Sequence, residues 1–258
     1  MADVEERVQR AERGGADEIA LLLHDPAQEV LEALLRNPSL SEEHLLILLS
    51  RKNLSEELLG AVAGHRRLAE SQRVKAALVL NPKSPRLLSL KLMKFLYLFD
   101  LVRVSLQPAV PTEIKRLAEN QVIGRLKQLP LGQQVSLARR ASARVAAALL
   151  GQGNPPVIAP VLDNPYLTEA AVLSVLRREE LPGAVVEALA HHPKWSQRYD
   201  VRVQLVRHPL TPLAVALGFL PALKPEDLRV LVEDKSMNPA LRDYLRAEVD
   251  RRLRRRHP

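Results

Sequence analysis

The sequence predicts an all-α protein, a right-handed superhelix of about six stacked helical hairpins. Two observations predict this fold class. Leu and Ala dominate the apolar residues, whereas aromatic residues make up 3% of the chain. This composition favours helices, because strands are rich in aromatic and β-branched residues. The sequence also repeats itself internally, which is typical of architectures built from stacked helical units.

The longer repetition has a constant offset of 127 residues, which pairs position 1 with position 128 and continues through the chain. When the chain is aligned with itself in this register, 32 positions are identical without any gap, about a quarter of those compared. Chance gives roughly half that number or less at this composition. We therefore expect a tandem duplication with copies at residues 1–127 and 128–258, stacked as one continuous superhelix. The identical pairs include Val8 with Val135, His65 with His192, and Pro82 with Pro209.

A shorter repetition of 40–44 residues divides each copy into three units. Each unit has an aliphatic residue that opens an apolar helical pattern, and about two helices per unit are expected. These marker residues are Val30, Val74, Ile114, Val157, Val201 and Leu241.

The ends and starts of helices are marked by prolines and hydroxyl residues. Asn-Pro at 37, 81 and 164 and His-Pro at 208 predict helix ends, because the residue before proline is pushed out of the α region. LSEE at 40–43 and 54–57 and LTEA at 167–170 predict helix starts, with Ser or Thr as the N-cap and a buried leucine beneath the turn. The units near 121 and 248 lack the Asn-Pro stop, so longer helices are expected there.

Three segments carry a resemblance to a known family: DPAQEVLEALLRNP (25–38), RVKAAL (73–78) and DVRVQL (200–205). They resemble the second helix of a unit in the HEAT-repeat family and its bacterial relatives, including the leucine-rich-repeat variants. The 40–44 residue period extends this resemblance over nearly the whole chain. The resemblance implies an α-superhelix whose second helices line a concave side, which is an extended surface for binding.

Composition excludes several classes of function. The chain has no cysteine, so disulfides, thiolate nucleophiles and cysteine metal sites are excluded. Its charged N-terminus predicts no secretory signal, and no stretch is apolar enough for a membrane span, so we expect a cytoplasmic protein. The net charge of +8 belongs largely to a basic C-terminus, where five of the last eight residues are arginines.

No motif indicates catalysis or a cofactor. The sequence contains no Gly-rich phosphate loop, nucleophile elbow or metal-binding motif, so no catalytic, cofactor-binding or metal-ligating residue is predicted. His65 and His192 occupy matching positions in the two copies. A metal site is one interpretation, and a histidine that caps free carbonyls at a helix end is the other, favoured one.

The segment HPKWSQRYDVR (192–202) is the richest in aromatic and charged residues. Trp195, Arg198 and Tyr199 are candidates for binding a partner, and with Asp200 they resemble the aromatic and acidic site of HEAT-like alkylpurine DNA glycosylases. The alternative is that Trp195 packs in the core, because the first copy has an apolar Leu68 at the matching position.

Four basic residues follow a marker residue directly: Lys75, Lys115, Arg202 and Arg242. One interpretation is a basic ridge along the concave side that binds an acidic partner. The other is a ladder of salt bridges between neighbouring hairpins.

These observations favour a non-catalytic interaction scaffold that binds a protein or peptide partner on an extended concave surface. The partner would be acidic if the basic ridge takes part. The alternative is a nucleic-acid-binding protein, attracted through non-specific charge and resembling the alkylpurine DNA glycosylases.

Overall fold

The computed structural model describes residues 2–65, 70–234, 237 and 239–256, and in this part of the chain all regular structure is helical. The prediction of an all-α protein is confirmed. The chain divides into two compact units, Met1–Gly124 and Arg125–Pro258, which are described separately below. This boundary lies close to the predicted junction between residues 127 and 128.

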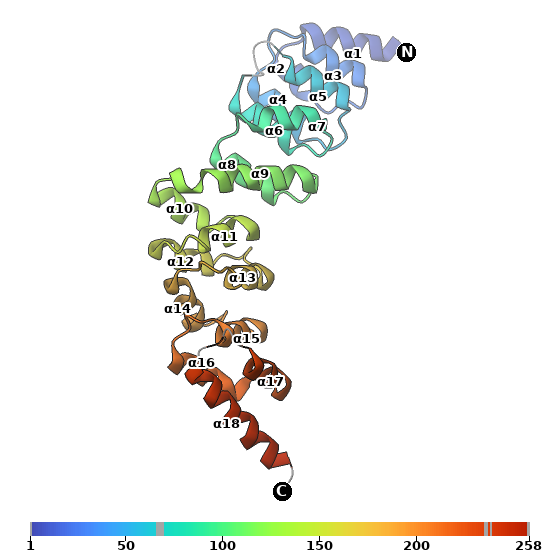
Figure 1. The fold of residues 1–258 in the computed structure, drawn as a ribbon. Helices are drawn as coiled ribbons and strands as arrows, with labels where there is room; N and C mark the ends of the chain where they lie inside the picture. Colours follow the sequence, from blue (N-terminus) through green and yellow to red (C-terminus); the bar gives the residue numbers. More distant parts are fainter. Residues whose placement is uncertain (1, 66–69, 235–236, 238, 257–258) are drawn as a thin grey trace. The chain divides into compact units, whose positions relative to one another are not determined.

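Nine helices are described in the first unit (Figure 1). They are α1 (Ala2–Arg13), α2 (Ala16–Leu22), α3 (Gln28–Leu34), α4 (Glu42–Ser50), α5 (Glu56–Ala63), α6 (Gln72–Leu80), α7 (Arg86–Met93), α8 (Leu98–Leu106) and α9 (Thr112–Arg125).

The described part of the second unit also has nine α-helices, together with two short 3-10 segments, η1 (Leu126–Gln128) and η2 (Leu220–Ala222). The α-helices are α10 (Leu131–Ala138), α11 (Ala143–Leu150), α12 (Pro155–Leu162), α13 (Glu169–Leu176), α14 (Gly183–His191), α15 (Tyr199–Arg207), α16 (Leu213–Phe219), α17 (Pro225–Glu233) and α18 (Pro239–Arg256).

The helices of the two units begin at matching positions. Helix α2 begins at Ala16 and its counterpart α11 at Ala143, and the same offset relates the starts of α3 to α9 to those of α12 to α18. The expectation of about two helices per unit of 40–44 residues is wrong. The marker residues fall on α3, α6, α9, α12, α15 and α18, so each period holds three helices. The additional starts include the one at Ser55, whose side chain accepts a hydrogen bond from the Leu58 N–H and caps α5.

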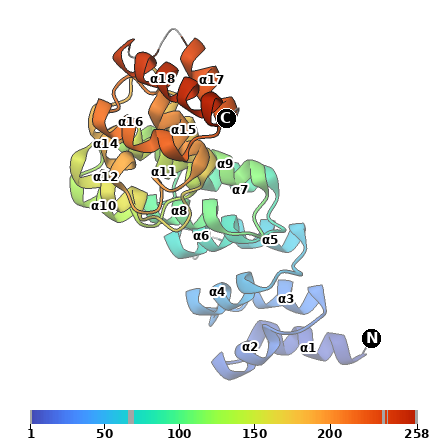
Figure 2. The same cartoon turned by 90° about the horizontal axis from the view of Figure 1, so that it is seen from below.

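Within each unit the helices pack in two rows (Figures 1 and 2). In the first unit α1, α3 and α5 lie side by side in one row, and α4, α6 and α8 lie in the other. In the second unit α10, α12 and α14 form one row and α11, α13 and α15 the other. Fully buried leucines such as Leu34, Leu48 and Leu58 fill the space between the rows of the first unit. Because the helices have only about two turns, this packing rather than intrinsic propensity stabilises them.

The predicted start and stop signals are confirmed. Ser41, Ser55 and Thr168 each accept a backbone hydrogen bond at the start of α4, α5 and α13. The leucines before them, Leu40, Leu54 and Leu167, are at most 4% exposed. Helices α9 and α18, which lack the Asn-Pro stop, run for 14 and 18 residues.

The asparagines of the Asn-Pro stops have a second role, which is to clamp a neighbouring helix. Asn37 is 2% exposed, and its amide donates to the carbonyls of Ala11 at 2.8 Å and Gly14 at 3.0 Å, at the end of α1. Asn164, its counterpart in the second unit, makes the same contacts to Ala138 and Ala141 at the end of α10. The last carbonyls of a helix have no partner within it, so these amides satisfy them. Asn81 clamps the end of α4 in the same way, through the carbonyls of Leu49 and Arg51.

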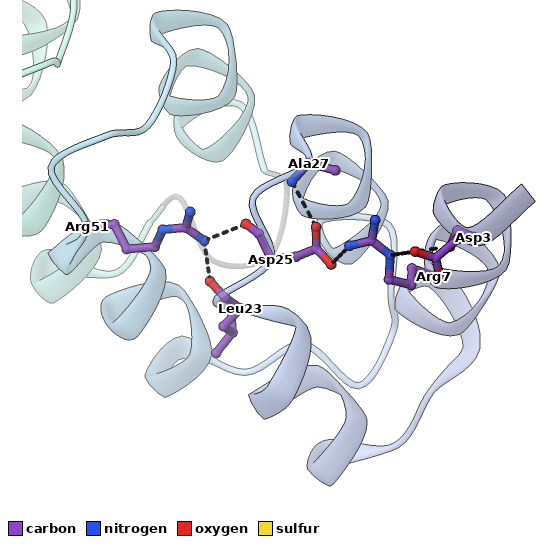
Figure 3. A network of polar contacts seen from close by, with 6 residues as sticks. All are labelled: Asp3, Arg7, Leu23, Asp25, Ala27 and Arg51. Atoms are coloured by element: carbon purple, nitrogen blue, oxygen red, sulfur yellow. Dashed lines mark hydrogen bonds and ion pairs between the residues drawn. The ribbon is translucent and has the colours of Figure 1, made fainter. Parts of the chain in front are cut away.

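A polar network ties the first four helices together (Figure 3). The buried Asp25 carboxylate pairs with Arg7 of α1 and accepts the Ala27 N–H at 2.8 Å, before α3. Arg51, after α4, donates to the carbonyls of Leu23 at 2.7 Å and Asp25 at 3.0 Å. Because a buried carboxylate is stable only when it is paired and hydrogen-bonded, this network holds the chain between α2 and α3 in place.

We predict that Asn37→Ala destabilises the protein by about 2–3 kcal/mol, because it removes two donors from helix-end carbonyls at a buried position. Asn164→Ala is expected to act similarly. Urea unfolding followed by circular dichroism measures the change. Asn120→Ala, at an exposed position in α9, is the control and should cost less than about 0.5 kcal/mol. A loss no greater than the control's would contradict the clamp.

The fourth stop residue is His208, and we predict that it makes the stability of the protein depend on pH. Burial lowers the pKa of His208 below its ordinary value near 6.5, so the folded protein keeps this side chain neutral. The unfolded chain then binds the proton more readily, and stability falls as the pH drops below about 6.5. His208→Asn introduces the residue found at Asn81 and removes this contribution. The free energy of unfolding of the variant should therefore fall less than that of the wild type between pH 7 and 5, which denaturant melts at both pH values test. Parallel falls would show that His208 does not titrate on unfolding.

Candidate functional site

The four predicted ridge residues each contact the loop that precedes their own helix. Lys75 pairs with Glu70 at 2.8 Å, and Lys115 donates to the Pro108 carbonyl at 3.1 Å. The two arginines do the same, since Arg202 donates to the Ser196 carbonyl and Arg242 to the Met237 carbonyl, both at 3.1 Å.

The helix position explains this shared role. Each of the four bases is the fourth residue of its helix, and helical side chains lean toward the helix N-terminus. A long basic side chain at this position therefore reaches back over the preceding loop. Lys75 is only 8% exposed and lies 5.2 Å from the Phe95 ring centroid, so it is not a surface charge. These described contacts are local to each loop, and the basic ridge and the ladder between hairpins both stay predictions.

The aromatic residues predicted to bind a partner are occupied by structural contacts. Trp195 is 1% exposed, and its indole N–H donates to the Leu162 carbonyl at 2.9 Å, so the interpretation that it packs in the core is the correct one. Tyr199 donates its hydroxyl to Asp227. Arg198 is exposed at the start of α15, and Asp200 is exposed in the first turn of that helix. The structure therefore does not gather Trp195 and Asp200 into an open site.

Both histidines lie at helix ends, and His65 contacts a helix-end carbonyl as the favoured interpretation predicted, whereas His192 contacts a carboxylate. The His65 ring nitrogen is 3.1 Å from the Leu35 carbonyl, at the end of α3. His192 lies 3.3 Å from the Asp163 carboxylate and accepts the Lys194 N–H. No group of three or more His, Asp or Glu side chains in the described part of the chain is arranged to hold a metal ion.

The strongest candidate for a functional site is a groove in the first unit. It lies along α4, α6 and α8, which belong to the same row, and encloses about 560 Å³. This volume lies within the range of ligand-binding pockets, about 300–1,000 Å³. The floor of the groove is apolar and is formed by Leu46, Leu49, Ala76, Ala77 and Leu80.

Polar groups line the two ends of the groove. At the end where α6 and α8 begin, the Gln72 side-chain oxygen is buried and has no hydrogen-bond partner. Arg73, at the same end, is paired with Glu42 at 3.0 Å and Glu43 at 2.8 Å. The end where the three helices finish has Lys52 and Arg103, and Arg103 lies 3.8 Å from the carboxylate of Asp100, which also lines the groove. A buried acceptor without a partner is rare in folded proteins, and the Gln72 oxygen is covered, so a ligand in the groove would reach it only if this side chain turned.

Exposed aromatic residues border the groove. Tyr97, which is 65% exposed, lines it, and Phe95 and Phe99 next to it are 57% and 38% exposed. The matching positions of the second unit hold Ala222, Lys224 and Glu226. Exposed aromatics therefore occur at these positions in the first unit alone, and they are not required by the architecture that the two units share.

The matching surface of the second unit differs in its polar contacts. Two polar contacts cross from α15 to α17, namely Tyr199 to Asp227 and Arg207 to Asp234. The first unit has Gln72 with Asp100 and Leu80 with Gln107 at these positions. The floor also differs, because Val203 and Gln204 replace Ala76 and Ala77.

Tyr199 is held on several sides. Its hydroxyl donates to the Asp227 carboxylate and accepts the Lys224 N–H at 2.9 Å, while the Lys224 ammonium lies 5.0 Å from the ring centroid. Burial, together with the hydrogen bond to Asp227, raises the pKa of Tyr199 above its ordinary value. Tyr199 is therefore a neutral donor at physiological pH and links α15 to the start of α17.

The groove was not predicted from the sequence, but a signal was present. The alignment of the copies pairs Gln72 with Tyr199, Lys52 with Glu179, and Arg73 with Asp200. Such divergence between the two copies marks positions whose residue type the shared fold does not fix.

The predicted basic tail lies largely outside the described residues, which do not include the side chains of Arg252, Arg254, Arg255 and Arg256. Arg251 pairs with Glu248 within α18.

Comparisons with protein-family models, with curated proteins and with solved structures find no match to this chain. Among the described residues, no helix is both long and apolar enough to cross a bilayer.

We predict that Tyr199→Phe destabilises the second unit by about 1–2 kcal/mol, because it removes the hydroxyl that bonds Asp227 and the Lys224 N–H. Denaturant unfolding measures the loss. Tyr166→Phe is the matched control, since Tyr166 is 50% exposed, and it should change stability by less than about 0.5 kcal/mol. Equal effects of the two changes would show that the closure contributes nothing.

Proposed function

We propose that this chain is a non-catalytic scaffold that binds a segment of another protein in the groove of the first unit. The observation that carries the proposal is the difference between the two units. One groove is open and has a buried acceptor without a partner, and the matching surface of the other is crossed by two polar contacts. An extended peptide supplies the backbone N–H donors and the side chains that such a groove can accept.

The proposal includes the architecture. The chain is a tandem duplication of a nine-helix unit, related to the HEAT-like superhelices and forming one right-handed superhelix in the cytoplasm. The constant offset between matching helix starts and the repeated asparagine clamp support the duplication. Two rows of helices in each unit support a superhelix, because repeat units bury their apolar faces by stacking.

A single-stranded nucleic acid is the second candidate, and exposed aromatics beside basic residues favour it. The groove itself favours a peptide. A polyanion needs several cations that are free to contact phosphates. Arg73 is already paired with Glu42 and Glu43, so Lys52 and the weakly paired Arg103, 3.8 Å from Asp100, are fewer cations than a polyanion needs. Lys52 has no ion pair among the described contacts, so the groove is matched to one or two carboxylates.

Selection from a random peptide library displayed on phage tests the function. The full-length chain is the target, and a Gln72→Tyr variant is the parallel target. The introduced tyrosine is expected to bond Asp100 as Tyr199 bonds Asp227, and so to close the groove. Recovered peptides should bind this variant at least about tenfold more weakly than the wild type, a loss of about 1.4 kcal/mol.

Two further variants make the selection decisive. Gln133→Tyr adds a tyrosine at an exposed position of α10 and should leave binding unchanged. Ala76→Val with Ala77→Gln copies the floor of the second unit and closes the groove by a different route, in case Gln72→Tyr does not fold. Failure to enrich any peptide would overturn the proposed function. Peptides that bind every variant equally would remove the groove as their site.

A further inference from the structure

The groove of the first unit has a direction and a fixed length, and these define its ligand. Gln72 and Leu80 lie at opposite ends of α6, eight residues apart. At 1.5 Å per residue they are separated by about 12 Å along the helix axis. An extended peptide covers about 3.3 Å per residue, so about four residues span the groove.

The chemistry changes along this length. At one end the exposed Tyr97 ring offers an apolar face, close to Gln72, whose side-chain oxygen is covered. The middle is floored by Ala76, Ala77 and Leu80. The far end presents the two cations, Lys52 and Arg103. The side chain of Arg103 is 67% exposed, and its contact with Asp100 is long at 3.8 Å, so that pair contributes little and leaves the guanidinium available.

Comparison with the second unit shows that the positive charge along the groove of the first unit is not required by the shared fold. Lys52 and Arg73 correspond to Glu179 and Asp200, and Arg103 corresponds to Val230. The two copies therefore carry opposite charge at two of these positions while they keep the same helices. A requirement of the scaffold would be the same in both copies.

We infer that the groove binds an acidic peptide segment of about four extended residues, one segment per chain. The inference rests on the proposed function and deepens it. Small aliphatic side chains of the segment cover the floor, and a carboxylate lies between Lys52 and Arg103. The second unit takes no segment, because Tyr199 and Arg207 bridge α15 and α17.

Fluorescence anisotropy with defined probes tests the charge preference. Three labelled peptides share a Gly-Leu-Ala-Leu core and end in Glu-Glu, Gln-Gln or Lys-Lys, and labelled oligothymidylate is the fourth probe. The Glu-Glu peptide should bind the full-length chain about tenfold more tightly than the other peptides, and its affinity should fall with added salt. It should bind with a stoichiometry of one per chain.

A charge-reversed variant tests the location. Lys52→Glu with Arg103→Glu should reverse the preference toward the Lys-Lys peptide. Lys127→Glu with Arg139→Glu reverses two exposed bases of the second unit and should leave the preference unchanged. Circular dichroism checks that both variants keep the helical content of the wild type.

The outcomes separate this inference from the proposed function. Equal affinities for the three peptides, or an unchanged preference in the Lys52 and Arg103 variant, would overturn the acidic ligand while peptides recovered by display still support a scaffold. Two peptides bound per chain would overturn the closure of the second unit. Oligothymidylate that binds more tightly than the Glu-Glu peptide and displaces it would assign the groove to nucleic acid instead. A charge-reversed variant that loses its helical signal is replaced by Lys52→Gln with Arg103→Gln, which should abolish the preference.

Discussion

A buried asparagine amide that closes the end of a neighbouring helix is the contact on which both units depend. Most helices here have seven to nine residues, so the carbonyls that lack an intrahelical partner make up about half of each helix. Where such carbonyls lie in the interior, water cannot satisfy them. Asn37, Asn81 and Asn164 each supply two donors to one helix end and accept a backbone N–H in their own turn. The same side chain thus follows the end of its own helix and fixes that helix to its neighbour in the same row.

The elements that the sequence predicts are those with a local cause. Ser41, Ser55 and Thr168 act as N-caps because a hydroxyl at that position meets free N–H groups whatever lies around it. The predicted number of helices per period was too low, because the apolar pattern of a short buried helix continues into the next helix. Helices α7 and α8 illustrate this, since Leu87 to Val102 reads as one apolar stretch but is broken at Lys94–Tyr97.

The site could not be predicted from the sequence to the same extent, because its residues act across helices. Lys75 and Arg202 lie at periodic positions and suggested a ridge, yet helix geometry turns them back onto their own loops. Trp195 suggested a stacking surface, yet it is enclosed by the core. Gln72 carried no signal alone. It becomes informative by comparison with its counterpart, Tyr199, which donates a hydrogen bond to Asp227. In the first unit the matching residues, Gln72 and Asp100, both line the open groove.

The proposed duplication would let one unit acquire a binding surface while the other keeps the shared packing. Each unit keeps the cores and clamps that its helices need, so positions between α6 and α8 can change in one unit while the other retains a closed arrangement. The polar contacts that cross the second unit stabilise it, whereas the first unit forgoes them and leaves an acceptor buried without a partner. That cost has no structural compensation in the groove itself. Because the Gln72 oxygen has almost no exposed surface, a bound segment can offset this cost only if the Gln72 side chain turns toward the groove.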